Sequence, residues 1–504
     1  MLTMTSSLQR AAMQFSHKPA IIDQEGRWTW GEHLDRVSKL AHILRGLGVD
    51  RGGRFGILSR NTYRQIELLH AGYWSGSIPV PVNVRLAPKE IAYIVENAEC
   101  DTLFVEPIFL ELFDVDPLLD WKHKIVVIGD ADASGLPASE QLILHADPAE
   151  PVETQEDDDA ILLYTGGTTG RSKGVRLTHC NIVSNGLQVG LELSIKSDDI
   201  YFHVAPMFHS ADLLGTAVTL MGGAHVALPM FSPENYLKAI ETLRPTVGMV
   251  APTMLIMMLQ EFDPREFDTS SMRTILYGSA PMAVEWVKKT LEALPDVNLV
   301  QGYGLTETSP LLTILNGKTH REAIATGNTD VLKSAGKVLA GLDIKFDDAT
   351  GQEVMVRGPN VTPGYLKSDE ANASAFEDGW FRTGDIGRLD SEGHLYLLDR
   401  KKDMIISGGE NVYSSEVEAA LYQHPDVIEA AVFGLPDSTY GETVSAALVI
   451  VEGSVLDADA AIAHCRKSIG GYKIPRRIFF LDELPKSAVN KILKTELRKM
   501  FADA

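Results

Sequence analysis

YTGGTTGRSKG, at residues 164–174, places three glycines and three threonines ahead of Lys173. Glycines and small hydroxyl residues let backbone N–H groups approach anionic oxygens, and Arg171 and Lys173 add positive charge, so the segment predicts a phosphate-holding loop. A Walker A loop would continue with Ser or Thr and open a helix, whereas Lys173 is followed by Gly174 and the strand-like VRLTH. We therefore expect the loop to join two strands; for the segment alone, a flexible surface turn is the alternative.

Helix and strand patterns alternate on the N-terminal side of this loop. Helices are expected at 31–47, 63–75 and 88–97, and strands at 54–58, 78–82 and 102–105. Beyond the loop, YFHVAP, AHVALP and VGMVAPT, at 201–206, 224–229 and 247–253, read as buried strands that end in loops. This alternation is typical of layered α/β sheets, which bind ligands at such strand ends.

The chain after about residue 340 changes character. Short strand patterns punctuated by glycine indicate an antiparallel or barrel-like section, and the charged DRKKD at 399–403 is interpreted as a linker. The last hundred residues alternate again, with a basic helix expected from residue 491, and they predict a small α+β domain.

Composition excludes several classes of function. The 504-residue chain, 45% hydrophobic, exceeds what one core usually supports, and its net charge of -22 would repel nucleic acid or an anionic membrane. The three cysteines are widely spaced without a CxxC pair, which indicates buried thiols in a reducing cytoplasm. We expect no signal peptide and no transmembrane segment, because the N-terminus lacks an apolar region and Pro252 interrupts the most apolar stretch, 245–260.

Five motifs together resemble those of the adenylate-forming enzymes, the superfamily of acyl- and aryl-CoA synthetases, peptide-synthetase adenylation domains and firefly luciferase. Besides the opening loop they are GYGLTET at 302–308, WFRTGD at 380–385, DRKKDMIISGGENVYSSEVE at 399–418 and LPKSAVNKILK at 484–494. They recur in the family's order over nearly the whole chain. The resemblance implies a large adenylating domain at 1–398 with layered α/β sheets and a distorted β-barrel, a hinge at 399–403, and a small mobile α+β domain at 404–504.

The resemblance assigns the nucleotide contacts. It implies that the loop holds the β- and γ-phosphates of ATP, that Tyr303 packs on the adenine, and that Thr306 contacts the α-phosphate. Mg²⁺ would be held by Glu307 with Thr168, a carboxylate suiting this hard cation. Asp385 and Arg400 would bind the ribose hydroxyls; a turn-capping aspartate is the alternative. The remaining implied nucleotide contacts are Thr165, Gly166, Gly167, Thr169, Gly170 and Lys173 in the loop, and Gly278, Ser279 and Ala280, for which a plain strand-to-helix turn is nearly as good an account.

Lys491 lies where the family places its catalytic lysine. A lysine there would relieve the negative charge that accumulates when a carboxylate meets the α-phosphorus of ATP. The preceding residue is Asn490 instead of the usual glycine, and asparagine also tolerates positive φ. Lys486 and Lys494 are alternative candidates, as is a solvated start of the basic helix.

Other family positions concern the acid and CoA. His209, in PMFHS, matches a histidine between the acyl pocket and the thiol tunnel, although a lone histidine is commonly structural. Ser407, Gly408 and Gly409 match the loop that lines the pantetheine tunnel, where glycine allows close approach. Lys402 aligns with the hinge residue that absorbs the domain rotation.

The pocket for the acid is expected to include Met207, Phe208, Asp212 and Leu213. Because most of this wall is apolar and the TGG loop and DRKKDMIISGGENVY are familiar in fatty-acyl-CoA ligases, we expect an acyl-CoA synthetase for medium- or long-chain fatty or similarly apolar acids. Asp212 is discordant: it could face a substrate hydroxyl or amine, as in an aryl or hydroxycinnamate ligase, or cap the helix that follows.

ATP, Mg²⁺ and CoA are the implied cofactors, and a small carboxylic acid is the implied partner. A non-catalytic nucleotide sensor is the competing function from another class, but it would have no use for Lys491 or Asp385. The sequence leaves the oligomeric state open, with a homodimer among the alternatives.

Overall fold

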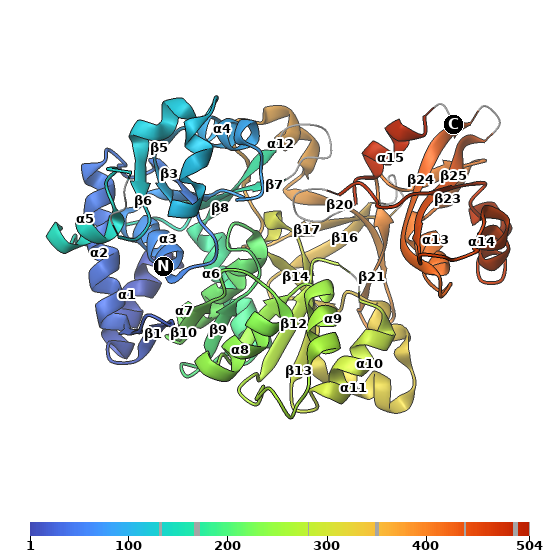
Figure 1. The fold of residues 1–504 in the computed structure, drawn as a ribbon, viewed down its shortest axis with the longest axis horizontal. Helices are drawn as coiled ribbons and strands as arrows, with labels where there is room; N and C mark the ends of the chain where they lie inside the picture. Colours follow the sequence, from blue (N-terminus) through green and yellow to red (C-terminus); the bar gives the residue numbers. More distant parts are fainter. Residues whose placement is uncertain are drawn as a thin grey trace. The chain divides into compact units, whose positions relative to one another are not determined.

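A computed structural model describes residues 1–130, 134–165, 172–280, 282–347, 352–437, 440–486 and 492–502. Its internal contacts divide the chain into two compact units (Figure 1). Unit 1 comprises residues 1–343, 356–381 and 391–395, and unit 2 comprises residues 344–355, 382–390 and 396–504. The expected α/β class, with a large N-terminal part and a small C-terminal part, is confirmed.

A nine-stranded sheet is the centre of unit 1 (Figure 1). Its strands, in spatial order, are β15 (Lys337–Val338), β14 (Leu311–Leu315), β13 (Asn298–Gly304), β12 (Thr274–Gly278), β11 (Val247–Val250), β9 (Ile200–His203), β10 (Ala224–Ala227), β1 (Pro19–Ile22) and β2 (Arg27–Thr29). The run from β13 to β1 is parallel, whereas β14 and β2 pair antiparallel with their neighbours.

Helices cover both faces of this sheet because its strands are apolar on both faces. Phe202 points into a core with the helices α8 (Pro233–Leu243), α9 (Pro252–Glu261), α10 (Val284–Ala293) and α11 (Gly317–Thr326). Its neighbour Tyr201 points into the opposite core, which contains residues of α6 (His179–Glu192) and α7 (Gly215–Met221). The period of two along β9 thus places alternate residues in different cores.

A second, four-stranded parallel sheet lies in the N-terminal part of unit 1, and its elements agree with the expected alternation. Its order is β4 (Ile78–Pro81), β3 (Arg54–Leu58), β5 (Cys100–Val105) and β6 (Ile125–Val127), and the helices of this part are α1 (Met4–Phe15), α2 (Trp30–Gly46), α3 (Tyr63–Ser75), α4 (Pro88–Asn97) and α5 (Ser139–His145).

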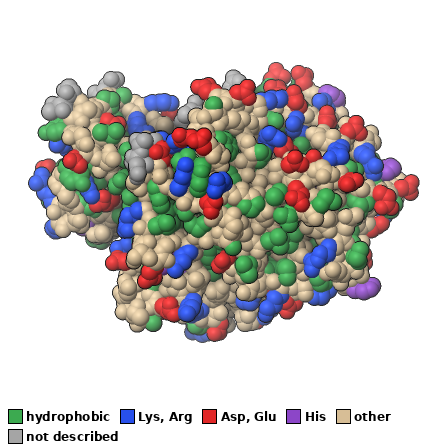
Figure 2. All heavy atoms as spheres, turned by 180° about the vertical axis from the view of Figure 1, so that it is seen from behind, with side chains coloured by type: hydrophobic (Ala, Val, Ile, Leu, Met, Phe, Trp, Pro, Cys, Tyr) green, Lys and Arg blue, Asp and Glu red, His purple; other side chains and the backbone are tan. Residues whose placement is uncertain are grey.

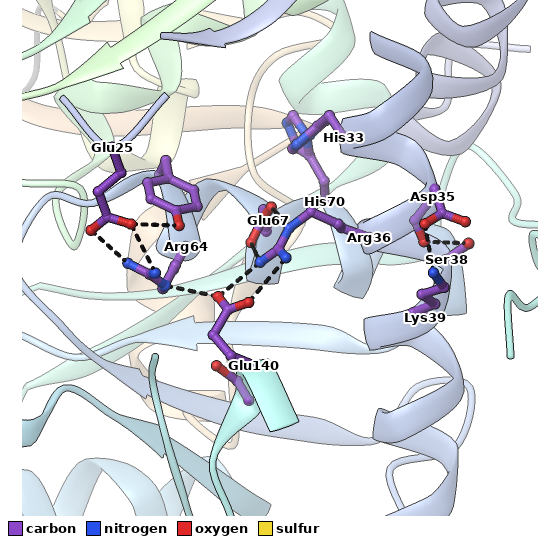
Figure 3. Close-up of polar contacts among 12 residues, drawn as sticks. Glu25, His33, Asp35, Arg36, Ser38, Lys39, Arg64, Glu67, His70 and Glu140 are labelled. Carbon is purple, nitrogen blue, oxygen red and sulfur yellow. Dashed lines mark hydrogen bonds and ion pairs between the residues drawn. The ribbon is translucent and has the colours of Figure 1, made fainter. Parts of the chain in front are cut away.

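An ion network joins three of these helices (Figure 3). Arg36 of α2 lies between two carboxylates, at 2.5 Å from Glu67 of α3 and 2.8 Å from Glu140 of α5. Arg64 lies 2.8 Å from Glu140 and 3.0 Å from Glu25. Burial raises the pKa of Glu67. The hydrogen bond and charge of Arg36 act in the opposite direction and offset the cost of burying the Glu67 carboxylate.

Unit 1 also contains a three-stranded antiparallel sheet. Its order is β18 (Gly364–Tyr365), β8 (Lys173–Thr178) and β7 (Asp159–Thr165), so β8 is the central strand. The opening loop joins β7 to β8, which agrees with a loop between two strands. Thr165 and Lys173 are direct partners in this pairing.

Unit 2 contains a sheet in the order β23 (Glu410–Val412), β22 (Ile405–Ser407), β25 (Gly441–Ile450) and β24 (Val427–Asp437), with β26 (Arg477–Phe480) beside β25. Its helices are α13 (Ser414–Leu421), α14 (Ala458–Cys465) and α15 (Lys494–Met500). The remaining strands and helix of the chain's antiparallel section are β16 (Asp343–Asp347), β17 (Glu353–Arg357), α12 (Asp369–Ala375), β19 (Phe376–Glu377), β20 (Trp380–Leu389) and β21 (Leu395–Arg400). The first two residues of DRKKD, Asp399 and Arg400, are the last residues of β21.

Surface features agree with the composition. On the face shown in Figure 2, Lys and Arg side chains are scattered among Asp and Glu side chains. Within the described ranges, no helix is long and apolar enough to cross a membrane. Cys100 and Cys465 are buried, Cys180 is partly buried, and all three are free thiols.

Candidate active site

Parallel strands bring three of the predicted segments to one edge of unit 1. The strands β9, β12 and β13 run in the same direction, and at their carboxyl ends the chain continues into residues 207–213, 278–280 and 303–307. Loops at the carboxyl ends of parallel strands are where α/β sheets bind ligands. The sheet thus brings the segments predicted to bind the acid and the segments predicted to bind the nucleotide to one edge.

A turn that requires glycine follows β13. A Cβ atom at Gly304 would lie 1.9 Å from the carbonyl oxygen of Pro310, so no other residue fits without moving the backbone. The 3-10 helix η4 (Thr306–Thr308) lies in this reversal. The turn thereby follows Tyr303 at the end of β13 and precedes Glu307 in η4.

The 278–280 segment is tied to the same turn. A Cβ atom at Gly278 would lie 2.5 Å from the carbonyl oxygen of Gly302, so the ends of β12 and β13 approach closely. Ser279 has a positive φ of 68°, and the side chains of Ser279 and Ala280 are exposed. Non-glycine residues with positive φ are uncommon and often mark functional segments.

The hydroxyl of Tyr365 is hydrogen-bonded to the carboxylate of Glu307. The sequence alone did not identify Tyr365 as a site residue. Its hydroxyl donates to Glu307 Oε1 at 2.8 Å, and the backbone N–H of Thr362 donates to the Glu307 carbonyl at 2.8 Å. Burial, together with the Glu307 charge, raises the pKa of Tyr365, so its hydroxyl keeps the proton that it donates. The PGY sequence at 363–365 reads as an ordinary turn, so only the fold reveals this contact.

Lys173 lies on the other side of the same tyrosine. Its ammonium is 5.3 Å from the centre of the Tyr365 ring, within the range of a cation–π contact. The pairing of β18 with β8 places Tyr365 opposite Val175, two residues after the lysine. One side chain therefore links the cation of the predicted phosphate loop to the carboxylate predicted to hold a metal.

A hydrogen bond connects the nucleotide-side turn to the acid-side segment. Thr306 Oγ1 and Ser210 Oγ are 2.9 Å apart, and both side chains are buried. Ser210 begins the 3-10 helix η3 (Ser210–Leu214), directly after His209. The segment that carries the predicted histidine is thus fixed against the residue predicted to contact the α-phosphate.

Asn61 shapes the chain that leads into this segment. Its buried side-chain amide donates to the carbonyls of His203 at 3.0 Å and Ala205 at 2.9 Å, and its Oδ1 accepts from the Met207 N–H at 2.9 Å. Three backbone groups beyond β9 are thereby satisfied without regular secondary structure. Asn61 is a second residue that the sequence reasoning missed.

The carboxylate of Asp212 is hydrogen-bonded to a histidine. Its carboxylate lies 2.8 and 2.9 Å from His203 Nδ1, and both residues are buried. It caps neither η3 nor α7, whose N-terminal residues have no side-chain cap bond. The capping alternative for Asp212 is therefore wrong. Of the other predicted acid-side residues, Met207 and Phe208 are buried and Leu213 is partly buried.

In unit 2, Arg400 pairs with Asp385. The distance from Arg400 Nε to Asp385 Oδ1 is 2.7 Å, and the aspartate is buried. Asp385 follows Gly384, which has a positive φ of 72°. The carboxylate predicted for ribose thus has its predicted arginine partner in contact.

The 407–409 segment is a tight hairpin. Ser407 pairs with Glu410 between β22 and β23, and Gly408 and Gly409 have φ of 63° and 85°. Two successive residues with positive φ are typical of a two-residue hairpin turn, and glycine adopts this conformation without strain. The glycines are thus explained locally by the turn, and their predicted role toward CoA stays a prediction.

Both alternative lysines in unit 2 are paired with carboxylates. Lys494 lies 2.7 Å from Glu418, and Lys486 lies 2.5 Å from Glu429. Lys402 contributes its carbonyl oxygen to a hydrogen bond of 3.3 Å from Arg498. The predictions at Gly166, Gly167, Thr168, Thr169 and Gly170, and at Asn490 and Lys491, lie outside the described residues.

The fold and the residues at the sheet edge define an adenylate-forming enzyme. The chain matches the AMP-binding enzyme family over residues 8–366 and the AMP-binding enzyme C-terminal domain over residues 416–491. It belongs to this family.

Relatives of known activity align with almost the whole chain. A feruloyl-CoA synthase of Amycolatopsis is 34% identical and covers 98% of each chain, and a methyl-dioxo-octahydroindenyl-propanoyl:CoA ligase of Mycobacterium tuberculosis is 34% identical over 99% of each. The o-succinylbenzoate CoA synthetase of Bacillus subtilis, solved with its acyl-adenylate intermediate, is 30% identical with a TM-score of 0.84, covering 98% of this chain and 97% of its own. That enzyme has also been solved with ATP and a magnesium ion.

The protein is accordingly an AMP-forming acid–thiol ligase that uses ATP, Mg²⁺ and CoA. The donor set fits magnesium: Glu307 supplies a carboxylate already oriented by Tyr365, and the described residues contain no group of three or more metal-ligating side chains. Mg²⁺ commonly binds through one or two carboxylates, with substrate phosphates and water completing its coordination. The relatives reported above are named for aryl or cyclic acids, which does not support the expectation of a fatty acid.

Proposed function

We propose that this ligase activates an aryl or cyclic carboxylic acid, such as a hydroxycinnamate, and transfers its acyl group to CoA. The contact between Thr306 and Ser210, at 2.9 Å, carries the proposal for the reaction site, because it joins the nucleotide-side and acid-side segments. Proximity of this kind supplies much of the advantage of a two-substrate enzyme.

In the first step a carboxylate oxygen of the acid attacks the α-phosphorus of ATP. A P–O bond forms to the acid, the bond to the bridging oxygen breaks, and pyrophosphate leaves. Lys173 and the 165–170 loop are proposed to hold the leaving phosphates, and Thr306 the α-phosphate. Mg²⁺, when bound, neutralises phosphate charge, and Glu307 would hold it. Lys491 is proposed to stabilise the charge that builds up as the two anions meet.

In the second step the CoA thiol loses its proton and its sulfur attacks the acyl carbon. The C–O bond to the phosphate breaks and AMP leaves. We propose that Lys402, in the 399–403 segment, is the hinge between the two steps, with residues 1–398 and 404–504 as the parts that rotate. Ser407, Gly408 and Gly409 would then line the path of the thiol, and His209 would contact the carboxylate and gate that path.

The substrate class is supported by two observations. The names of relatives that cover almost the whole chain refer to feruloyl, succinylbenzoate and dioxo-octahydroindenyl propanoyl groups. In this chain the buried Asp212 of the acid-side segment lines a cavity together with other polar side chains, among them His70 and Thr216. Both favour an acid that carries polar groups over a fatty acid.

Pyrophosphate release tests this function. The purified enzyme is supplied with ATP, Mg²⁺ and one acid at a time from a panel of hydroxycinnamic, aryl, cyclic keto, dicarboxylic and fatty acids, with and without CoA. We expect acid-dependent release with the aryl or cyclic acids and thioester only when CoA is present. Preference for a fatty acid would overturn the substrate class, and release with no acid would overturn the ligase assignment.

A further inference from the structure

A small cavity in unit 1 is lined in part by residues of the acid-side segment, and its wall contains both apolar and polar side chains. Its volume is about 40 Å³, which is about one water molecule's share of the liquid or slightly more. Met207 and Leu213, which flank His209 in the sequence, form part of its wall. The cavity can therefore accept a small oxygen-bearing group.

Hydrogen bonds between histidines form one wall of the cavity. Asp212 binds His203 Nδ1, His203 Nε2 lies 3.0 Å from His225 Nδ1, and His225 Nε2 lies 3.0 Å from Thr219 Oγ1. The chain is complete when each imidazole carries one proton, because each ring then donates once and accepts once. The side chains of Asp212, His203, His225 and Thr219 consequently use these hydrogen-bonding atoms on one another.

Two residues that line the cavity carry hydroxyls with no hydrogen-bond partner among the described residues. These residues are Tyr73, which is 4% exposed, and Thr216, which is 8% exposed. His70 also lines the cavity; its Nδ1 lies 2.8 Å from His33 Nε2, and its Nε2 has no partner in the described part of the chain. Polar groups in the interior normally bind protein atoms or water, so these three atoms have hydrogen-bonding capacity to offer a ligand group.

The charge of the wall restricts what that can be. Burial lowers the pKa of His70 to about 3 and the pKa of His225 well below its usual value, so both rings are neutral near pH 7. Asp212 contributes a carboxylate, and none of the described residues lining the cavity is a lysine or arginine. A second carboxylate on the ligand would therefore meet like charge without compensation.

We propose that this cavity is a specificity subsite that receives an uncharged oxygen group, a hydroxyl or carbonyl, from the far end of the acid substrate. The oxygen reaches it past Met207, an unbranched side chain that adapts to different shapes. Tyr73 and Thr216 offer hydroxyls that donate or accept, and His70 Nε2 offers a third position. This inference rests on the proposed function and narrows its substrate class to acids with an uncharged oxygen group.

The test compares three acids that differ only in the group farthest from the activated carboxylate. They are cinnamic acid, 4-hydroxycinnamic acid and 4-carboxycinnamic acid, or the equivalent series built on the best acid of the panel. We expect kcat/KM for pyrophosphate release to be at least about tenfold higher for the hydroxyl compound than for the unsubstituted acid, and lowest for the second carboxylate.

Thr216→Val and Tyr73→Phe remove only the unpartnered hydroxyls, so we expect both variants to fold with unchanged thermal stability. Each should lower the preference for the hydroxyl compound at least threefold while changing kcat/KM for the unsubstituted acid less than twofold. Thr216→Ser keeps the hydroxyl and should keep the preference. His320→Gln, which alters a buried histidine bonded to Tyr277 at 2.9 Å, is the control and should leave the preference unchanged.

Equal preference in the enzyme and both variants would overturn the subsite, as would a preference for the second carboxylate. Absence of pyrophosphate release with every acid, including the unsubstituted one, would instead overturn the proposed function. The two failures are therefore distinguishable in one set of measurements.

Discussion

On the nucleotide side of the proposed site, charged groups meet at the half-buried ends of short elements, whereas on the acid side Asp212 and His203 are buried and bonded to each other. Lys173 contacts the ring of Tyr365, and the hydroxyl of Tyr365 binds Glu307, so the two charged side chains share one uncharged partner. Asp212 and His203 satisfy each other inside the core. The comparison teaches that nucleotide-side changes should alter ATP use, and acid-side changes should alter stability and selectivity.

The largest effect is expected from Lys491→Ala. Loss of one preorganised charge at a developing anion reduces the rate about 10²- to 10³-fold, so acyl-AMP formation should be nearly abolished. Thioester formation from supplied acyl-AMP should be largely intact. Pyrophosphate release and thioester formation, measured separately, check this.

Lys486→Ala is the matched control, because Lys486 is paired with Glu429 at 2.5 Å. It should change the first step less than twofold. Equal losses in both steps for Lys491→Ala would contradict the role proposed for that lysine.

The next largest effect is expected from Asn61→Ala, which should lower both the stability and the activity of the enzyme. It leaves three backbone groups without their partner, at about 1 kcal/mol each, so we expect the free energy of unfolding to fall by about 3 kcal/mol. Denaturant unfolding measures this, and acid selectivity should broaden because the Met207 segment is released. Asn316→Ala, which removes a helix cap from Thr319, is the control, with about 1 kcal/mol lost and unchanged selectivity.

Tyr365→Phe keeps the ring beside Lys173 but removes the hydroxyl that orients Glu307. A hydrogen bond to a charged group contributes about 1.5 kcal/mol or more, so kcat/KM for ATP should fall about tenfold, with a higher Mg²⁺ requirement. Tyr164→Phe loses a comparable bond, of 2.6 Å to Asn97, in the same sheet, and should not affect ATP use. Similar ATP kinetics in the two variants would show that the Tyr365 hydroxyl has no role in the use of ATP.

The smallest expected effect is a pH dependence of stability shared by buried histidines. Burial lowers the pKa of His70 to about 3 and those of His179 and His320 to about 4. Below pH 6.5 the unfolded state binds protons that the folded state does not, so stability falls as pH drops from about 6.5 toward these values. Each histidine should contribute about 0.7 kcal/mol of loss between pH 7 and pH 6.

Unfolding measured at both pH values checks this slope. His320→Asn should make it shallower by one histidine's share, whereas His123→Gln, at an exposed histidine, should leave it unchanged. An unchanged slope in His320→Asn would show that burial does not hold that ring neutral.

Two features of the nucleotide side, the glycine turn after β13 and the joining of two strands by the opening loop, could be predicted from sequence because they are local. Gly304 is required by a carbonyl six residues away, and β7 and β8 are joined directly by the opening loop. The acid side could not be predicted in the same way. Asp212 bonds to His203, nine residues away, and whether an aspartate there caps a helix or binds a histidine depends on packing. Tyr365 reaches Glu307 across 58 residues.

Asn61 has a consequence for hybrid enzymes. Its three backbone partners lie 142 to 146 positions further along the chain. A crossover between two parental genes within this interval takes Asn61 from one parent. The backbone segment at 203–207, to which Asn61 is hydrogen-bonded, then comes from the other parent. Recombined chains of this family should therefore tolerate exchange best when both parts are inherited together, although neither would be recognised as a neighbour from the gene alone.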